Sequence, residues 1–152
     1  MISKERTYFI KMKEFKIFIA SSNDEKEERN TLKELILFVS RFTHNYGIEF
    51  LPVMWELESV DFMTGFTEKQ KEYNEKLVSS DMVFFLFGKR VGKNTHEEFR
   101  VACNQVQKNR YIKVYVYFKN VEMGGSSSIT SKDAENLQEV NKLKDTISNK
   151  LE

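Results

Sequence analysis

The sequence has little of what marks secreted or membrane-spanning proteins. Its single cysteine, Cys103, rules out an intramolecular disulfide, so nothing indicates an oxidising compartment. The longest apolar run, at positions 82–87, is much shorter than the ~20 residues that a membrane-spanning helix needs. Lysines interrupt the apolar residues near the N-terminus, so we expect no signal peptide. The sequence therefore predicts a cytoplasmic protein without a membrane partner.

An excess of charge of one sign is also missing. The chain has 24 Lys and Arg against 23 Asp and Glu, a net charge of +1. This balance argues against a polybasic membrane binder or a DNA coat, and we expect no direct nucleic-acid partner. The 152 residues suit one domain, and an aromatic content of 13% argues against disorder.

Short β-branched and aromatic runs alternate with segments of helical periodicity. Strands are predicted at 15–20, 48–55, 82–87 and 111–118, and helices up to about 43, over 67–79, from 95 onward and around 137–151. This order predicts an α/β fold: a flavodoxin-like, doubly wound parallel sheet of about four to five strands with helices on both faces. We assign 1–14 to a lead-in segment and 15–152 to a single domain, in which 121–131 is a flexible connector to the last helix.

Three details of packing follow from the pattern. The run 82–87 is apolar on both faces, so we expect it in the middle of the sheet and more buried than 111–118. Pro52 cannot donate a ladder hydrogen bond, which places its strand near a sheet edge or an irregularity. The first helix has one apolar face, which we expect to be buried and which consists of Leu32, Leu35, Ile36, Val39 and Phe42.

Ligands of such sheets bind beyond the carboxyl ends of the strands, and Glu98 lies in a segment that follows one of those ends. The spacing of Thr95 and Glu98 also fits a capping box, which is a purely structural role. Glu98 borders the apolar stripe of its helix, however, and a partly desolvated carboxylate over a cleft is chemically useful. His96 has no second ligand at metal spacing, so we expect no metal site, and Cys103 is interpreted as a core residue.

Two other features at the same edge are ambiguous. Residues 88–93 form a basic glycine loop that fails the phosphate-loop spacing, although Lys89 or Arg90 could still face a phosphate. Trp55 is either a rim residue of the core or a stacking surface for a base. A receiver domain is excluded, because acids are missing after the first strand and after the strand 82–87.

Three blocks together resemble a bacterial TIR domain. They are residues 16–22 (KIFIASS), residues 80–86 (SDMVFFL), and Glu98-Phe99 with Ala102. The resemblance covers roughly residues 15–120. Two features depart from the family: Asn94 stands where many members have Trp, and the loop after Trp55 has no proline.

The resemblance implies an NAD glycohydrolase of antiviral defence that releases nicotinamide and ADP-ribose or its cyclic form. Glu98 is the matched catalytic glutamate, and NAD is a substrate, so no cofactor is expected. Topology alone suggests the substrate-binding residues: Ser21, Ser22, Trp55, Lys89 and Arg90. Two alternatives remain open: a TIR module that self-associates without turnover, and a nucleoside deoxyribosyltransferase-like enzyme.

The resemblance also implies partners. We expect self-association with other TIR domains and turnover that rises with protein concentration. A TIR effector usually needs a sensor domain or subunit, for which 152 residues leave little room. The chain is therefore expected to be either an excised domain or a subunit activated in trans.

Overall fold

The predicted alternation of strands and helices is confirmed. The computed structural model describes residues 11–54, 66–108, 111–120 and 130–148. The strands are β1 (Lys13–Ser21), β2 (Ile48–Val53), β3 (Met82–Phe87) and β4 (Lys113–Phe118). The helices are the short 3₁₀ helix η1 (Asn23–Glu25), α1 (Lys26–His44), α2 (Phe66–Val78), α3 (Lys93–Gln107) and α4 (Ser131–Ser148).

The four strands form one parallel sheet in the order β2-β1-β3-β4. This is the flavodoxin-like order, and it agrees with the predicted α/β class. β3 pairs with β1 and with β4, so it is an inner strand, as predicted. β2 pairs only with β1 among the described strands, and Pro52 lies opposite Ile17 in that pairing. The edge position predicted for the proline is therefore confirmed.

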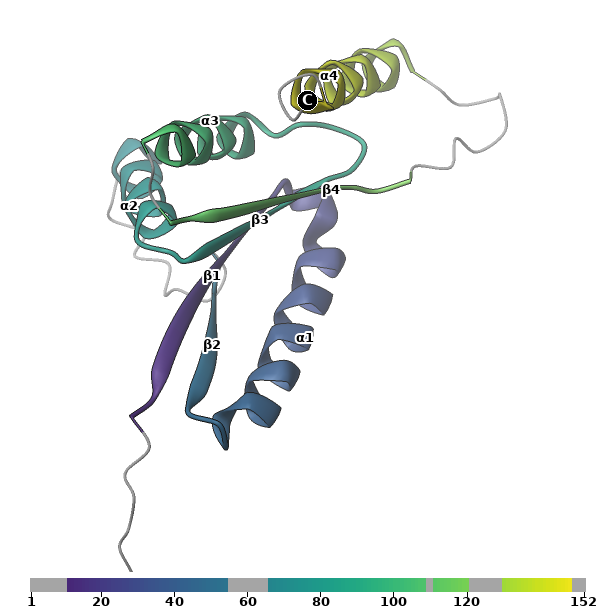
Figure 1. Ribbon diagram of the computed structural model, residues 1–152. Coiled ribbons are helices and arrows are strands. Elements are labelled where there is room, and N and C mark those ends of the chain that lie inside the picture. The colour runs from purple at the N-terminus through teal and green to yellow at the C-terminus, as the bar shows by residue number, and fades with distance from the viewer. Residues whose placement is uncertain (1–10, 55–65, 109–110, 121–129, 149–152) are drawn as a thin grey trace, which may run out of the picture.

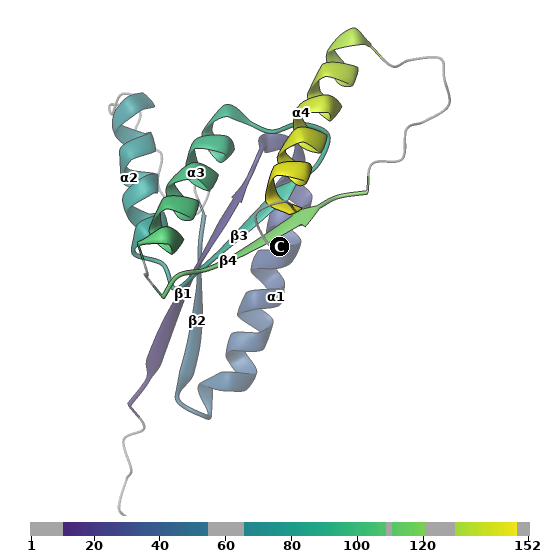
Figure 2. The same cartoon turned by 45° about the horizontal axis from the view of Figure 1, so that its top comes forward.

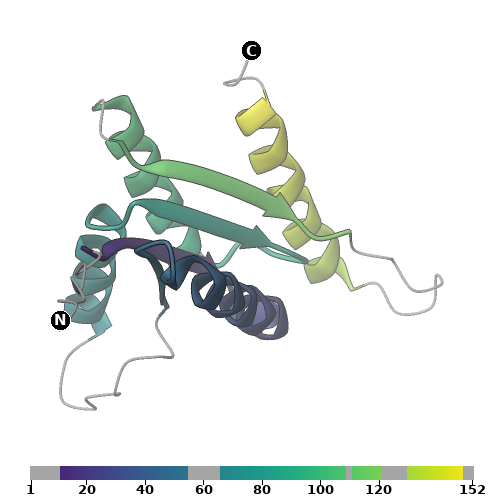
Figure 3. The ribbon, with the colours of Figure 1, turned by 60° about the horizontal axis from the view of Figure 1, so that its bottom comes forward.

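Helices lie on both faces of the sheet, but unevenly. α2, α3 and α4 lie on one side and α1 lies on the other (Figure 1). Val83, Phe85 and Phe87 of β3 point to the first side and pack around Leu77 of α2 and Ala102 of α3. Figure 3 shows α1 apart from α3 and α4, beside the β1–β2 half of the sheet. α1 therefore covers only part of its face.

β3 is more buried than β4, as expected, but it is not buried equally on both faces. Val83, Phe85 and Phe87 are almost fully buried, whereas Phe84 is only partly buried on the α1 side. The reason is the position of α1, whose contacts are mainly with β2. Apolar residues on both faces of β3 are therefore buried to different extents on the two sides of the sheet.

The predicted buried face of α1 is also corrected. Ile36 is buried, and Leu32 is partly buried. Three other members of the predicted stripe are exposed by 40% to 62%, namely Leu35, Val39 and Phe42. Helical periodicity shows which residues share one side of the helix, but it does not show which side of the helix faces the sheet. In the fold, the side of α1 that faces the sheet is partly polar, and much of its apolar side is exposed to solvent.

Of the helices in the described part of the chain, none combines the length and the apolar character needed to cross a membrane.

Candidate functional site at the carboxyl edge of the sheet

Glu98 lies inside α3 and is not part of a capping box. α3 begins at Lys93, and Gly92 occupies the capping position without a side-chain cap hydrogen bond. Thr95 therefore lies within the first turn, where its side chain is buried. The predicted Thr95–Glu98 capping box was wrong, because the helix starts earlier than its sequence signals suggest. The helix terminus consequently does not explain the placement of Glu98.

The surroundings of Glu98 disfavour the ionised form of its carboxyl group. Burial raises the pKa of Glu98 from 4.5 to about 7, because the anion loses solvation. A hydrogen bond from Gln70 of α2 opposes this rise, the neighbouring Glu97 adds to it, and Arg29 of α1 opposes it. A neutral hydrogen-bond donor of α2 and the positive charge of an arginine of α1 thus act on the same partly buried carboxylate.

A short polar chain holds α2 against α3 beside this carboxylate. Gln70 Nε2 donates to Asn74 Oδ1 at 3.3 Å, and Asn74 Nδ2 donates to Glu97 Oε1 at 3.2 Å. The two helices pack side by side (Figure 2). The amide chain fixes Gln70 where it can reach Glu98.

A second polar cluster closes the end of β1. The hydroxyl of Ser22 donates to the carboxylate of Glu25, and the guanidinium of Arg29 donates to the hydroxyl of Ser21. Arg29 Nη1 also donates to the carbonyl oxygen of Ser22 at 3.0 Å. Glu25 and Arg29 are 3% and 0% exposed, so these groups are satisfied inside the protein. Burial is the main cause that raises the pKa of Glu25, and the hydrogen bond from Ser22 opposes it.

The glycine at the end of β3 allows this cluster to form. A Cβ atom on Gly88 would lie 1.8 Å from Glu25 Oε1 and 2.6 Å from its Cδ. Both distances are far inside van der Waals contact, so only glycine fits while Glu25 keeps its place. At Gly92 a Cβ atom would lie 3.3 Å from Ser22 Cβ, so the loop 88–92 lies closely against the end of β1.

The predicted substrate-binding residues have different surroundings. Ser21 and Ser22 are buried and engaged in the cluster just described. Lys89 and Arg90 are exposed, and Arg90 forms a two-pronged ion pair with Asp24 at 2.5 and 3.0 Å. A phosphate would therefore compete with Asp24 for Arg90. Trp55 lies outside the described residues.

Sequence reasoning missed Arg29, Glu25 and Gln70. Glu25 and Arg29 are separated by four residues, and Ile36 follows Arg29 by seven, so all three lie on one side of a helix. This spacing was a usable signal, because Glu25 and Arg29 lie on the same side of the helix as the apolar Ile36 and can therefore be expected on its buried side. Gln70 carried no such signal, because polar residues surround it in sequence.

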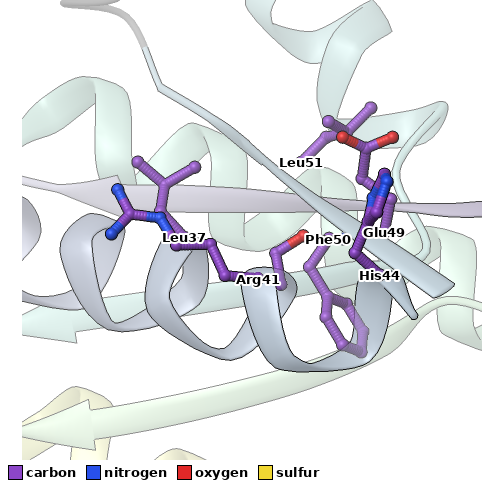
Figure 4. Close-up of a pocket in the computed structure, with 7 residues that line it drawn as sticks. Leu37, Arg41, His44, Glu49, Phe50 and Leu51 are labelled. Carbon is purple, nitrogen blue, oxygen red and sulfur yellow. Dashed lines mark hydrogen bonds between the residues drawn. The ribbon is translucent and has the colours of Figure 1, made fainter. Parts of the chain in front are cut away.

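The described residues were also searched for a second pocket and for a metal site. A surface pocket of about 340 Å³ lies between the second half of α1 and the start of β2 (Figure 4). Its lining residues are Leu37, Ser40, Arg41, His44, Glu49, Phe50 and Leu51. It thus lies at the amino end of the strands, away from Glu98. The described residues contain no group of three His, Cys, Asp or Glu side chains that could hold a metal ion.

Comparisons with known proteins give structural similarities only. No family model and no curated protein matches the chain. A 2-deoxyribosyltransferase from Leishmania mexicana is similar with a TM-score of 0.45 and 11% identity, over 70% of this chain and 65% of that one. The CMP N-glycosidase of Clostridium botulinum is similar with a TM-score of 0.39 and 15% identity, over 83% of this chain and 98% of that one. The chain thus spans less than two thirds of the first protein, and the site is interpreted from its own residues.

Proposed function

We propose that the chain is an enzyme that breaks the N-glycosidic bond of a ribosyl or deoxyribosyl substrate, with Glu98 as the carboxylate at the reacting sugar carbon. One observation carries this proposal. A partly buried glutamate with a pKa of about 7 follows the carboxyl end of β3 in a parallel sheet, and a hydrogen bond from Gln70 and the charge of Arg29 both act on it. Most surface glutamates of a capping or solubilising kind would keep an ordinary pKa.

The chemistry of the bond suits such a group. As the bond between C1′ and the base nitrogen breaks, its electron pair leaves with the base and positive charge develops on the sugar. An ionised carboxylate beside that carbon stabilises the charge more in the transition state than in the bound substrate. In hydrolysis the oxygen of a water molecule then bonds to C1′ and releases a proton, and in transfer a ring nitrogen of an acceptor base bonds to C1′ instead and releases its proton.

Each neighbour has a distinct part in the proposal. Gln70 donates to the carboxylate and orients it, while the polar chain to Asn74 and Glu97 keeps Gln70 in place. Arg29 favours the ionised form of Glu98 from inside the fold. Ser21 and Ser22 shape the end of β1 that borders the site and, through their bonds to Arg29 and Glu25, keep these charged groups in position.

We further propose NAD as the substrate. The resemblance to TIR domains favours NAD, whose nicotinamide leaves as a neutral molecule and needs no proton. The alternative is transfer or hydrolysis at a nucleoside or nucleotide. The two compared proteins supply test compounds for this alternative by their names, a 2-deoxyribosyl donor and CMP.

The test is a substrate panel analysed by chromatography. NAD, deoxynucleosides with and without an acceptor base, and CMP are each incubated with the wild-type protein and with Glu98→Gln. Release of nicotinamide or of a free base by the wild type, and its loss in the variant, supports the proposal. Equal release by both proteins contradicts the role of Glu98. No release from any compound at high protein concentration contradicts the proposed activity and leaves the interaction module as the better account.

A further inference from the structure

The polar chain between α2 and α3 has a direction that its chemistry fixes. It begins at Glu97, whose ionised carboxylate accepts hydrogen bonds but donates none. Asn74 must therefore direct Nδ2 toward Glu97 Oε1, at 3.2 Å, and its Oδ1 atom toward Gln70. Gln70 in turn must present Nε2 to that oxygen, at 3.3 Å. The orientation of both amide groups thus follows from the carboxylate at one end of the chain.

At the other end of the chain, Gln70 meets the carboxyl group of Glu98, to which it also donates a hydrogen bond. A glutamine amide has two N–H donors, both on Nε2, and one oxygen acceptor. The two donors are directed at Asn74 and Glu98, and the hydrogen bonds of the described residues leave Gln70 Oε1 without a donor. The site therefore holds an unused acceptor next to the candidate catalytic carboxylate.

Gln70 Oε1 is held close to Glu98. Gln70 and Asn74 are four residues apart, so they share the side of α2 that packs beside α3 (Figure 2). The oxygen and nitrogen of one amide group are about 2.2 Å apart, and a hydrogen bond spans about 2.9 Å. Gln70 Oε1 thus lies within roughly 5 Å of the Glu98 carboxyl group. Gln70 is half-buried, and an acceptor in such a place is normally matched by a donor, which a bound ligand can supply.

We propose that Gln70 accepts a hydrogen bond from the 2′-hydroxyl of the substrate's sugar and thereby selects ribosyl over 2′-deoxyribosyl compounds. This inference rests on the proposed function, in which Glu98 lies at C1′ of that sugar. The carbon that bears the 2′-hydroxyl is bonded to C1′, so this hydroxyl is the one closest to the reacting atom. Its hydrogen points to Gln70 Oε1, while Glu98 keeps the hydrogen bond from Nε2 of the same amide group.

The contact bears on which class of substrate the site takes. In NAD the ribose that carries nicotinamide has a 2′-hydroxyl, whereas a 2-deoxyribosyl donor has only hydrogen at this carbon. The contact also strengthens during the reaction, because positive charge at C1′ makes the neighbouring hydroxyl a stronger donor. The preference for a ribosyl compound should therefore be larger in kcat/KM than in binding.

Paired substrates that differ only in the 2′-hydroxyl test the inference. NAD is compared with the analogue that lacks the 2′-hydroxyl of the nicotinamide ribose, and CMP is compared with dCMP. The measured quantity is kcat/KM for the ribosyl compound divided by kcat/KM for the deoxyribosyl compound. The two compounds differ in intrinsic reactivity, but this difference cancels when the ratio of a variant is compared with that of the wild type.

Gln70→Met keeps the length of the side chain but removes its donors and its acceptor. We expect it to lower the ratio by about tenfold or more, the effect of losing a hydrogen bond that strengthens in the transition state. Asn74→Leu should lower the ratio in the same direction, because Gln70 then loses its anchor. Gln107→Met is the matched control, because Gln107 is exposed at the end of α3, about 13 Å along the helix from Glu98. It should keep the wild-type ratio and activity, and all three variants should retain the wild-type circular dichroism spectrum.

Binding without turnover separates this inference from the catalytic role of Glu98. Glu98→Gln protein keeps a side-chain oxygen that accepts a hydrogen bond from Gln70. In calorimetry it should bind NAD several-fold more tightly than the 2′-deoxy analogue, and the further substitution Gln70→Met should remove that difference.

The possible outcomes distinguish the inference from the proposed function. A Gln70→Met protein that cleaves its substrates with the wild-type ratio would overturn the inference and leave the role of Glu98 in place. Equal or undetectable binding of NAD and its 2′-deoxy analogue by Glu98→Gln protein would also overturn it. Cleavage that persists in Glu98→Gln protein, beside a ratio that falls in Gln70→Met protein, would overturn the role of Glu98 and support the selection by Gln70.

Discussion

Arg29 in the first half of α1 and Glu98 in α3 interact electrostatically across the carboxyl edge of the sheet, although they are far apart in sequence. Arg29 is 0% exposed, so its charge acts through protein rather than through water. Burial sets the direction of the pKa of Glu98, and Arg29 limits how far it rises. Through Arg29, the hydrogen-bonded cluster at the end of β1 is therefore connected to the candidate catalytic group.

Removing the charge of Arg29 should raise the pKa of Glu98 further. Arg29→Met takes away a group that lowers this pKa, whereas Arg29→Lys keeps the positive charge but loses the planar fork. Carbon-13 NMR titration of the glutamate carboxyl groups, with Glu98→Gln to assign the signal, gives the pKa directly. An unchanged pKa in folded Arg29→Met protein would show that the two groups do not interact.

The stability of the protein should depend on pH through Glu98. Its pKa is raised in the folded state, so between about pH 4.5 and 7 the folded form holds a proton that the unfolded form has lost. The contribution of Glu98 is therefore fully present below pH 4.5 and is lost as the pH rises through 7. Relative to Glu98→Gln, wild-type protein should lose stability across this window and stay level above it. Urea unfolding of both proteins at several pH values measures the difference, and a constant difference would refute the assignment.

The pH dependence of NAD cleavage should have the opposite sign. The proposed role needs ionised Glu98, and nicotinamide leaves without a proton. We therefore expect kcat/KM to rise tenfold per pH unit below about 7 and to level off above it. Activity that falls as the pH rises through this range would indicate that Glu98 acts as an acid.

Gly88→Ala should disturb the site through Glu25. The new methyl group would lie 1.8 Å from Glu25 Oε1, so the glutamate must leave its buried place beside Ser22. We expect a loss of about 1–3 kcal/mol in the free energy of unfolding, the usual scale for overpacking. In the Glu25→Ala background the same methyl group has room, so the two substitutions should be strongly non-additive. Additive losses in a double-mutant cycle would show that Gly88 is required for another reason.

Turnover should rise with protein concentration if the resemblance to TIR domains extends to self-association. Specific activity of the wild type in the assay for N-glycosidic bond cleavage should then increase as the protein is concentrated. A specific activity that stays high and constant down to very dilute protein would contradict this expectation.

The sequence predicts the sheet better than it predicts the packing of α1. Strand composition places β3 inside the sheet, and the missing N–H of Pro52 places β2 at the edge. Periodicity alone could not show that Leu35 and Phe42 stay exposed, because the rotation of a helix depends on what lies beneath it.

Within the site, Glu98 was predictable because an acid followed an apolar strand at the carboxyl edge. The buried partners were harder to find. Glu25 and Arg29 are charged residues at a helix start, where solvent-facing acids and bases are common. Their burial depends on Ser21, Ser22 and the close approach of Gly88, and these contacts exist only in the folded sheet.

The most direct test of the central claim compares Glu98→Gln with Glu97→Gln in the assay for N-glycosidic bond cleavage. Glutamine keeps the size of either side chain, and at position 97 its oxygen can still accept the hydrogen bond from Asn74. The account predicts a loss of ~100-fold or more in kcat for Glu98→Gln, with a retained fold, because one electrostatic contact to the transition state is removed. Glu97→Gln should remain within a few-fold of the wild type. A fully active Glu98→Gln protein beside an inactive Glu97→Gln protein would contradict the account.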